Sequence, residues 1–445
     1  MVAFIHKHKK FTSFQIITIG FATVILAGAL LLMLPVSSKA CASTPFHEAL
    51  FTAVSAVCVT GLVVQDTATY WSGFGQCVIL VLIQIGGLGV ITVAAALTML
   101  SGKKISLMQR SVMQEAIAAP KVGGIVRLTD FVLKATFLIE LTGALIMMPV
   151  FMKDFGKKGI WMSFFHSVSA FCNAGFDLMG TEKIKYASLT SYISNPVINI
   201  TIILLIVIGG IGFLTWEDIL TKKFRFKSYR MQSKVILITT ALLILVPAIF
   251  FFFQEFAKMT LKERILSSLF QSVTTRTAGF NTADLTIMTE VGWAIMMALM
   301  LIGGSPGSTA GGMKTTTFAV LLANAIASFR RKENVQLFGR RLENKAVKNA
   351  ATIFMMYITL FFAGAIIISA AEGLPFMICL FETASAIGTV GLTLGITPNL
   401  GILSQMVLMI LMFLGRVGGL TLIYAAFSGN GKELSKLPEE KITVG

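Results

Sequence analysis

The stretch LFTAVSAVCVTGL at residues 50–62 sets the plan of the chain, because three later stretches resemble it. They are FFHSVSAFCNAGF (164–176), LFQSVTTRTAGF (269–280) and LFETASAIGTVGL (380–392). Each has Phe at its second position and continues in a segment rich in Ser, Thr and Ala that is long enough for about three helical turns. Each then ends in a glycine followed by Leu or Phe: Gly61, Gly175, Gly279 and Gly391. The recurrence indicates an internal repeat.

A second motif follows each of these stretches at a similar interval. It takes the forms IGGLGVIT (85–92), IGGIGFLT (208–215), IGGSPGST (302–309) and GRVGGLT (415–421). Two motifs that recur in the same order make chance a poor explanation. In the last copy Arg416 replaces a glycine. Small residues allow membrane helices to pack closely, and we expect that role for Gly86, Gly89, Gly209 and Gly212.

The composition is that of a membrane protein with several spans. The chain is 55% hydrophobic and only 13% charged, whereas soluble proteins are about 25% charged. Apolar runs of about 20 residues, the length that crosses a bilayer, recur throughout. The first run lacks a small-residue cleavage pattern, so we expect a retained span rather than a signal peptide. The net charge of +16 is explained by topology-setting loops, and no nucleic-acid partner is predicted.

These patterns predict an all-α polytopic membrane protein with eight transmembrane helices. The unit is an apolar span, a short re-entrant pore helix, a glycine loop and a second span, and four tandem units surround a pseudo-fourfold central pore. Loop 303–313 breaks the second span of the third unit. The predicted units are 12–100, 126–220, 231–328 and 346–428, followed by a cytoplasmic tail at 429–445.

The distribution of lysine and arginine predicts the orientation. Segments 102–127, 222–234 and 329–348 are rich in basic residues, as cytoplasmic loops are. A smaller lysine cluster at 153–158 points the other way. The balance places both termini in the cytoplasm of a multi-pass plasma-membrane protein, with the glycine loops entering from outside. The basic segments also predict contact with anionic lipid, or docking of a cytosolic regulator.

The four glycine loops predict an ion filter made of backbone carbonyls. Non-helical backbone survives at membrane depth only where protein or water satisfies its polar groups. Neither the glycines nor the two residues before each of them include a carboxylate, which suits a larger monovalent cation. The loop TVGL is close to the TVGYG of potassium channels. The predicted filter residues are Val59, Thr60, Gly61, Asn173, Ala174, Gly175, Thr277, Ala278, Gly279, Thr389, Val390 and Gly391.

The stretch LIGGSPGSTAGGMKTTT at 301–317 predicts a polar, flexible loop within a span. Such a loop can obstruct the path below the filter. It lacks the Gly-Lys-Ser/Thr order and the preceding strand of a phosphate-binding loop. Arg416 is costly inside a membrane, and the loop carbonyls are its natural partners, so it is either an electrostatic barrier or a structural clamp. The predicted gate residues are Gly303, Gly304, Ser305, Pro306, Gly307, Ser308, Thr309, Ala310, Gly311, Gly312, Met313, Lys314 and Arg416.

Over nearly its whole length the sequence resembles the Trk/Ktr/HKT superfamily of potassium transporters, and most of all the Ktr B membrane subunit. The resemblance implies K⁺ selection at the four loop glycines. Gly61 in place of serine implies preference for K⁺ over Na⁺, although a part for Na⁺ in transport stays open. It also implies that the intramembrane loop is a gate, that Arg416 adds a barrier beside it, that the subunit is a homodimer and that a cytosolic nucleotide-binding ring regulates it.

Other classes of function find less support. No nucleophile–base set or organic cofactor motif is visible, so an enzyme is not expected, and the four histidines lack ligand spacing. The five cysteines are expected to be free, buried thiols. Arg276 is expected to have a carboxylate partner among Glu48, Asp66, Asp177, Asp284 and Glu382.

Two alternatives remain open. A conventional secondary carrier would bind its substrate at the broken helix 301–317. Carriers usually pair such breaks in inverted repeats, whereas this sequence predicts one break among four parallel units. A membrane scaffold for another protein would leave the four glycine loops unexplained.

Overall fold

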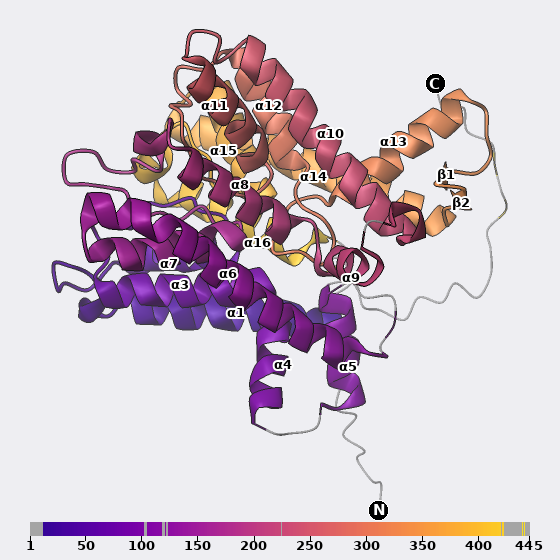
Figure 1. Ribbon diagram of the computed structural model, residues 1–445, viewed down its shortest axis with the longest axis horizontal. Helices are drawn as coiled ribbons and strands as arrows, with labels where there is room; N and C mark the ends of the chain where they lie inside the picture. Colours follow the sequence, from indigo (N-terminus) through magenta and orange to yellow (C-terminus); the bar gives the residue numbers. More distant parts are fainter. Residues whose placement is uncertain are drawn as a thin grey trace, which may run out of the picture.

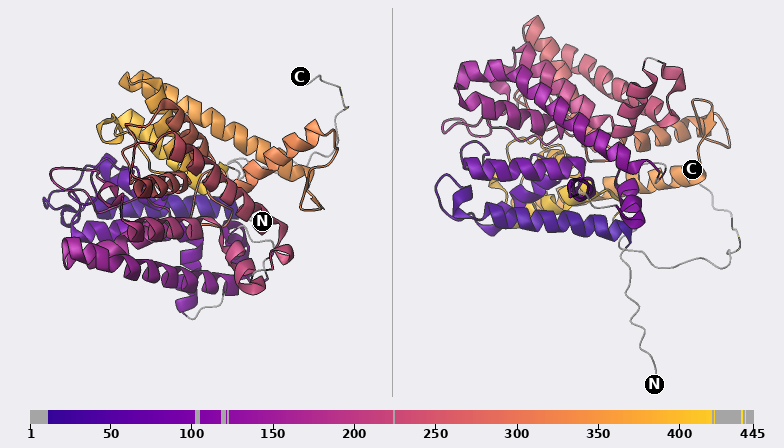
Figure 2. Two further views of the ribbon diagram at one scale, coloured as in Figure 1. Left: turned by 45° about the horizontal axis from the view of Figure 1, so that its top comes forward. Right: turned by 60° about the horizontal axis from the view of Figure 1, so that its bottom comes forward.

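A computed structural model describes residues 12–101, 105–117, 121, 123–223, 225–419, 421, 438 and 440. Apart from two positions, the predicted cytoplasmic tail lies outside these residues, as does most of the end of the fourth predicted unit, 420–428. Helices dominate the described chain, and they run mostly side by side (Figure 1; Figure 2). The all-α prediction is therefore confirmed.

Among the described residues, four helices are long and apolar enough to cross a membrane: α1 (Ser13–Leu32), α6 (Ile125–Phe155), α10 (Met231–Phe253) and α14 (Asn344–Glu372). Each opens one of the predicted units. The first starts at a capping box, in which Thr12 and Gln15 satisfy each other's backbone N–H groups. The last ends at Gly373, a left-handed C-cap residue.

A short helix follows each long one: α2 (Phe46–Val57), α7 (Lys158–Phe171), α11 (Leu261–Thr274) and α15 (Phe376–Gly388). With 12, 14, 14 and 13 residues, these helices are too short to cross a bilayer. Their Ser and Thr side chains are largely buried, and some hydroxyls bond within the helix, as when Ser163 donates to Gly159 O at 2.7 Å, whereas others bond to neighbouring segments, as when Ser167 donates to Glu140 O at 2.6 Å. Polar side chains can therefore sit at the centre of an apolar molecule.

The second helix is broken in the first three units, which corrects the expectation of a single break. Helix α3 (Gly73–Leu88) meets α4 (Val90–Leu100) at 97°, and α8 (Pro196–Gly210) meets α9 (Phe213–Lys222) at 99°. In the third unit a loop separates α12 (Glu290–Leu301) from α13 (Thr315–Phe329), and α16 (Ile402–Val417) ends at Gly418.

The cause lies in single glycines. Gly89, Gly212 and Gly418 have φ angles of 87°, 91° and 89°, a conformation that other residues rarely adopt. Within the described residues four helices qualify as spans by length and composition, or six with the bent pairs. The number of eight spans stays a prediction.

Short elements fill the connections. They are α5 (Leu107–Ile117), a hairpin of β1 (Gln336–Leu337) and β2 (Arg340–Arg341), and the 3₁₀ turns Pro35–Ser37, Thr190–Tyr192, Phe226–Ser228 and Thr397–Asn399. The hairpin lies with α13 beyond one end of the bundle (Figure 1). The second helix of each unit also packs against the short helix of the next unit: α3 on α7, α8 on α11, α12 on α15, and α16 back on α2. The units are thus arranged in a closed circle.

Candidate functional site

The four glycine loops share one backbone conformation. In each, a residue other than glycine has a positive φ angle, and a glycine with positive φ follows two positions later. Positive φ is uncommon outside glycine, so a fourfold recurrence marks a common local fold. The first residues are Val59 (58°), Asn173 (59°), Thr277 (75°) and Thr389 (51°), and the glycines are Gly61 (93°), Gly175 (70°), Gly279 (83°) and Gly391 (92°).

Hydroxyl groups at the ends of the short helices hold these loops. Ser55 Oγ accepts from Gly61 N at 3.0 Å, and Ser385 Oγ accepts from Gly391 N at 3.0 Å. In the second loop Ser169 Oγ instead donates to a carbonyl, that of Phe176, at 2.7 Å, and Thr274 Oγ1 does the same in the third. Throughout the described chain, no hydrogen bond is accepted by a carbonyl of the twelve predicted filter residues. These carbonyls are free to take another partner.

The four glycines face one another in a closed ring. A methyl group added to Gly61 would meet the carbonyl oxygen of Ala174, and one added to Gly175 would lie 2.8 Å from Ala278 O. The series continues from Gly279 to Val390 O and returns from Gly391 to Thr60 O. A side chain at any of these four positions would therefore collide with the carbonyl of the next loop.

A small cavity of about 100 Å³ lies over this ring and is lined by all four glycines. Asp66 and Asp177 also line it. Asp66 accepts hydrogen bonds from Thr69 N at 2.7 Å and from Tyr186 N at 2.8 Å. Burial, and then the nearby Asp66 and Glu48 carboxylates, raise the pKa of the Tyr186 phenol. The acidic residues at this mouth were not predicted, because loops distant in sequence bring them there.

The predicted gate loop closes on itself between α12 and α13. Gly303 N donates to Met313 O at 2.8 Å, and Thr315 N donates to Gly304 O at 3.0 Å. The Ser305 and Thr315 hydroxyls lie 3.1 Å apart. The loop is therefore a compact structure with its ends joined.

The loop also docks on the other units. Ser305 N donates to Gly210 O at 3.0 Å, and Phe213 N donates to Gly307 O at 2.7 Å. On another side, Gly312 N donates to Gly415 O at 3.1 Å. These bonds tie the loop to the second and fourth units.

Thr309 connects the loop to the second filter loop. Its hydroxyl donates to Phe171 O at 2.9 Å and accepts from Asn173 Nδ2 at 2.8 Å. Its N–H donates to Gly209 O at 3.2 Å. Thr309 and Asn173 are both fully buried. A change in the loop therefore alters the surroundings of Asn173, one of the predicted filter residues.

Two cations hold the carbonyls of the loop. The Arg416 guanidinium donates to the carbonyls of Thr309, Gly86 and Gly87, and Lys314 Nζ donates to Ala310 O at 2.8 Å. Both side chains are half-buried. The predicted contact between Arg416 and the loop is thus present, and the arginine also bridges to the first unit.

The predicted carboxylate partner of Arg276 is wrong. Its side chain is 7% exposed and donates to Thr240 Oγ1 at 3.4 Å. None of the ion pairs among the described residues includes it. Glu382, one of the candidates, instead accepts from the hydroxyls of Thr393 and Thr397. The Arg276 side chain points toward Thr240 rather than toward a carboxylate, and the sequence does not determine that direction.

The four glycines that were predicted to allow close helix packing have two different roles in the structure. Gly86 and Gly209 face the Val57 and Phe171 carbonyls at contact distance, so close packing is confirmed for them, whereas Gly89 and Gly212 form the bends described above.

All five cysteines are free, as expected. Cys58, Cys172 and Cys379 are buried, but Cys41 and Cys77 are exposed, contrary to expectation.

A circle of apolar helices with unpaired carbonyls at its centre defines a class of membrane proteins that move small cations. The family model for TrkH, described as a cation transport protein, matches residues 6–432. The chain belongs to this family, which confirms the resemblance inferred from its motifs. The match is to transport proteins rather than to enzymes.

Known proteins of similar sequence cover the whole chain. The potassium/sodium uptake protein NtpJ of Enterococcus hirae is 41% identical, over 98% of this chain and 98% of its own. The Ktr system potassium uptake protein B of Bacillus subtilis is 38% identical, over 99% and 98%. The crystal structure of the potassium transporter TrkH from Vibrio parahaemolyticus matches with a TM-score of 0.74, covering 94% of this chain and 86% of its own, at 19% identity. This last similarity supports the shared fold.

Proposed function

We propose that the chain is the ion-conducting subunit of a potassium uptake system, and that the four glycine loops select K⁺ by their backbone carbonyls. The ring of Gly61, Gly175, Gly279 and Gly391 carries this proposal, because it brings unpaired carbonyls to one axis. Such carbonyls replace the hydration shell of a cation. The NtpJ and Ktr relatives, named for potassium uptake, support the choice of ion.

Loop 303–314 is the proposed gate on this path. Its bonds to Phe171, Asn173 and Gly415 hold it beside the filter loops in a closed arrangement. Arg416 and Lys314 add positive charge there, which opposes the passage of a cation. The proposed regulator is a cytosolic nucleotide-binding ring that acts on a homodimer of this chain. The similarity to Ktr system proteins supports this assembly, in which both termini face the cytoplasm.

The alternatives have less support. A carrier with its substrate at 301–317 is not favoured by the family match, and the Gly303–Lys314 segment directs its backbone groups to itself and to its neighbours. The family match to cation transport proteins also does not favour a membrane scaffold.

Ion flux into vesicles tests the proposal. The purified protein is expected to carry K⁺ and Rb⁺ and to exclude Na⁺, and Gly61→Ser is expected to reduce the Rb⁺/Na⁺ ratio by about tenfold or more, a change of roughly 1.4 kcal/mol. Because Gly73 has open space around it, Gly73→Ser is the matched control and should leave the ratio unchanged. Adding Na⁺ on one side tests whether sodium assists transport. Equal flux of all three ions through the unmodified protein would refute the proposed filter.

A further inference from the structure

A cavity of about 350 Å³ opens beside the gate loop, between α10, α13 and α14. Pro306 of the loop forms part of its wall. Much of the remaining lining is apolar, as at Val235 of α10, Val320 of α13 and Ile353 of α14, while Gln232, Thr316, Thr317 and Asn349 add polar groups. A ligand in this cavity would therefore touch the loop directly.

A second cavity of about 220 Å³ continues the first along the contact between α10 and α13. The two share Val235 and Leu337, so they form one groove. Leu242 and Leu322 line the second cavity, and they are 56% and 52% exposed. Both belong to apolar helices, so this part of the groove opens to the outside of the molecule between apolar side chains. Its walls suit an alkyl chain.

The mouth of the groove carries unpaired positive charge. Residues 330–348 contain seven basic residues and two acidic ones. All seven are exposed, and none of the ion pairs in the part of the chain described includes them. The hairpin of this segment contributes Leu337 and Leu342 to the groove, and α14 contributes Ala346. Cations thus lie next to apolar lining, as at a lipid headgroup.

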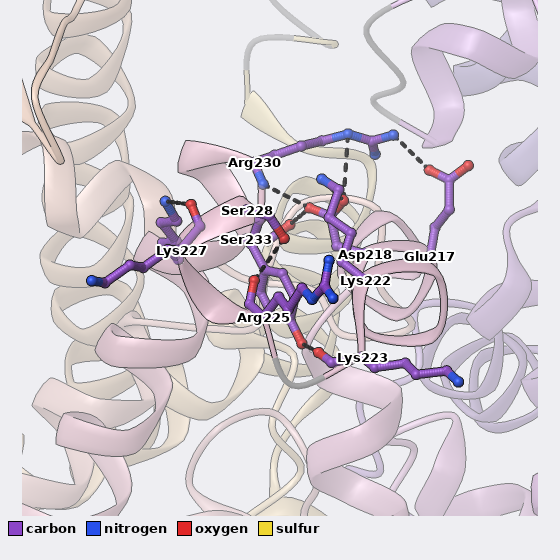
Figure 3. A network of polar contacts seen from close by, with 11 residues as sticks. Glu217, Asp218, Lys222, Lys223, Arg225, Lys227, Ser228, Arg230 and Ser233 are labelled. Atoms are coloured by element: carbon purple, nitrogen blue, oxygen red, sulfur yellow. Dashed lines mark hydrogen bonds and ion pairs between the residues drawn. The ribbon is translucent and has the colours of Figure 1, made fainter.

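The linker before α10 adds further charge. Asp218 and Glu217 engage Lys222 and Arg230 at 2.7 and 2.8 Å. Lys223 and Lys227 point away from these two carboxylates (Figure 3). Met231 and Gln232, which follow this linker, line the groove. A basic linker therefore leads directly into two α10 residues that line the groove.

We propose that this groove, lined by α10, α13, α14, the hairpin and Pro306, binds an anionic phospholipid. An acyl chain lies between α10 and α13, and the phosphate lies among the cations of 330–348. The lipid comes from the leaflet on the side of the basic linkers. By filling the space behind Pro306, it stabilises the closed loop; this second step rests on the proposed gating function.

Lipid retention tests the site without reference to transport. Protein extracted from membranes that contain phosphatidylglycerol is expected to keep that lipid, as measured by native mass spectrometry. Val320→Trp fills the groove, and Arg341→Glu with Lys345→Glu reverses charge at its mouth. Each change is expected to lower retention about fivefold or more. Leu204→Trp, on the exposed face of α8, is the control and should retain lipid as the unmodified protein does.

Three results would overturn the proposal. One is equal retention in the unmodified protein, the groove variants and the control. Another is retention of neutral phosphatidylcholine in place of phosphatidylglycerol. The third is a dimer that Val320→Trp dissociates with no change in bound lipid, which would make the groove an interface between copies. Rb⁺ flux into phosphatidylcholine vesicles with and without phosphatidylglycerol tests the loop step. If the unmodified protein carries Rb⁺ equally in both, the lipid does not stabilise the gate, whereas absence of all flux would contradict the proposed function instead.

Discussion

The break in the third unit differs from those in the first and second. At Gly89 and Gly212 one glycine with positive φ turns the chain by 97° and 99° between two helices. Between α12 and α13 the same place holds a whole loop, 302–314, whose groups bond to the second and fourth units. A single residue is enough to turn a helix. The additional residues therefore serve another purpose, which we propose is to obstruct the path.

Removing the loop should have the largest effect. Deleting 305–310 removes the bonds to Phe171, Asn173 and Gly209, while Gly304 N and Gly311 O already lie 3.4 Å apart, so the shortened chain can close. We expect Rb⁺ uptake without a regulator to rise about tenfold or more, equivalent to at least ~1.4 kcal/mol of barrier. An unchanged Rb⁺/Na⁺ ratio is the control for an intact filter. Uptake at the original rate would show that the loop does not limit flux.

Substitutions at Arg416 distinguish its two proposed roles, an electrostatic barrier and a structural clamp. Arg416→Lys keeps the charge but cannot reach Thr309, Gly86 and Gly87 together, whereas Arg416→Gln removes the charge. If charge opposes cations, uptake should rise several-fold, about 1 kcal/mol, in the glutamine variant alone. Equal increases in both would assign Arg416 a clamping role only. Thermal unfolding of the two variants shows whether either has lost structure.

Thr309→Val isolates one connection of the loop. It removes the hydroxyl between Phe171 O and Asn173 Nδ2 at nearly constant volume. Leaving buried polar groups unpaired costs about 1–3 kcal/mol, so we expect a less stable closed loop and a severalfold rise in Rb⁺ uptake. Ser308→Ala is the matched control, because the Ser308 hydroxyl donates within the loop, to Ser305 O. The idea of a connection fails if both variants behave alike.

Of the changes considered, alanine substitutions at Gly89 and Gly212, the two glycines at the helix bends, should have the smallest effect. Because both glycines form similar bends, the two variants can be compared directly. A methyl group on Gly89 has Thr92 Oγ1 as its nearest neighbour at 3.8 Å, so Gly89→Ala should cost only the backbone strain of its φ of 87° and ψ of 132°, about 1–3 kcal/mol. On Gly212 it would lie 2.7 Å from Pro306 O in the loop. Gly212→Ala should therefore unfold at a lower temperature than Gly89→Ala and also alter flux. Identical melting and flux would show that the bend and the loop are independent.

The sequence predicted what depends on local backbone. Glycine is needed where the loops converge, so Gly61, Gly175, Gly279 and Gly391 stand out in the sequence, and the structure brings them together. Arg416 could be assigned to the loop because a buried guanidinium needs carbonyls.

Features that depend on contacts between segments distant in the sequence could not be predicted. A glycine that packs and one that turns the chain look alike in sequence, which is why the bends at Gly89 and Gly212 were missed. The partner of Arg276 and the place of Asp66 over the ring are set by segments far away along the chain. No local pattern records these neighbours.

The circular packing of α3 on α7, α8 on α11, α12 on α15 and α16 on α2 has a consequence for biosynthesis. The last contact joins the fourth unit to the first, and a methyl group added to Gly391 would meet the Thr60 carbonyl. A nascent chain that has emerged as far as α15 has the first three of these interfaces available, but α16 is not yet present to pack on α2. Contacts of such long sequence separation form late. Closure of the circle therefore waits until the fourth unit has been synthesised, and a chain without that unit lacks one of the four loops of the proposed ion path.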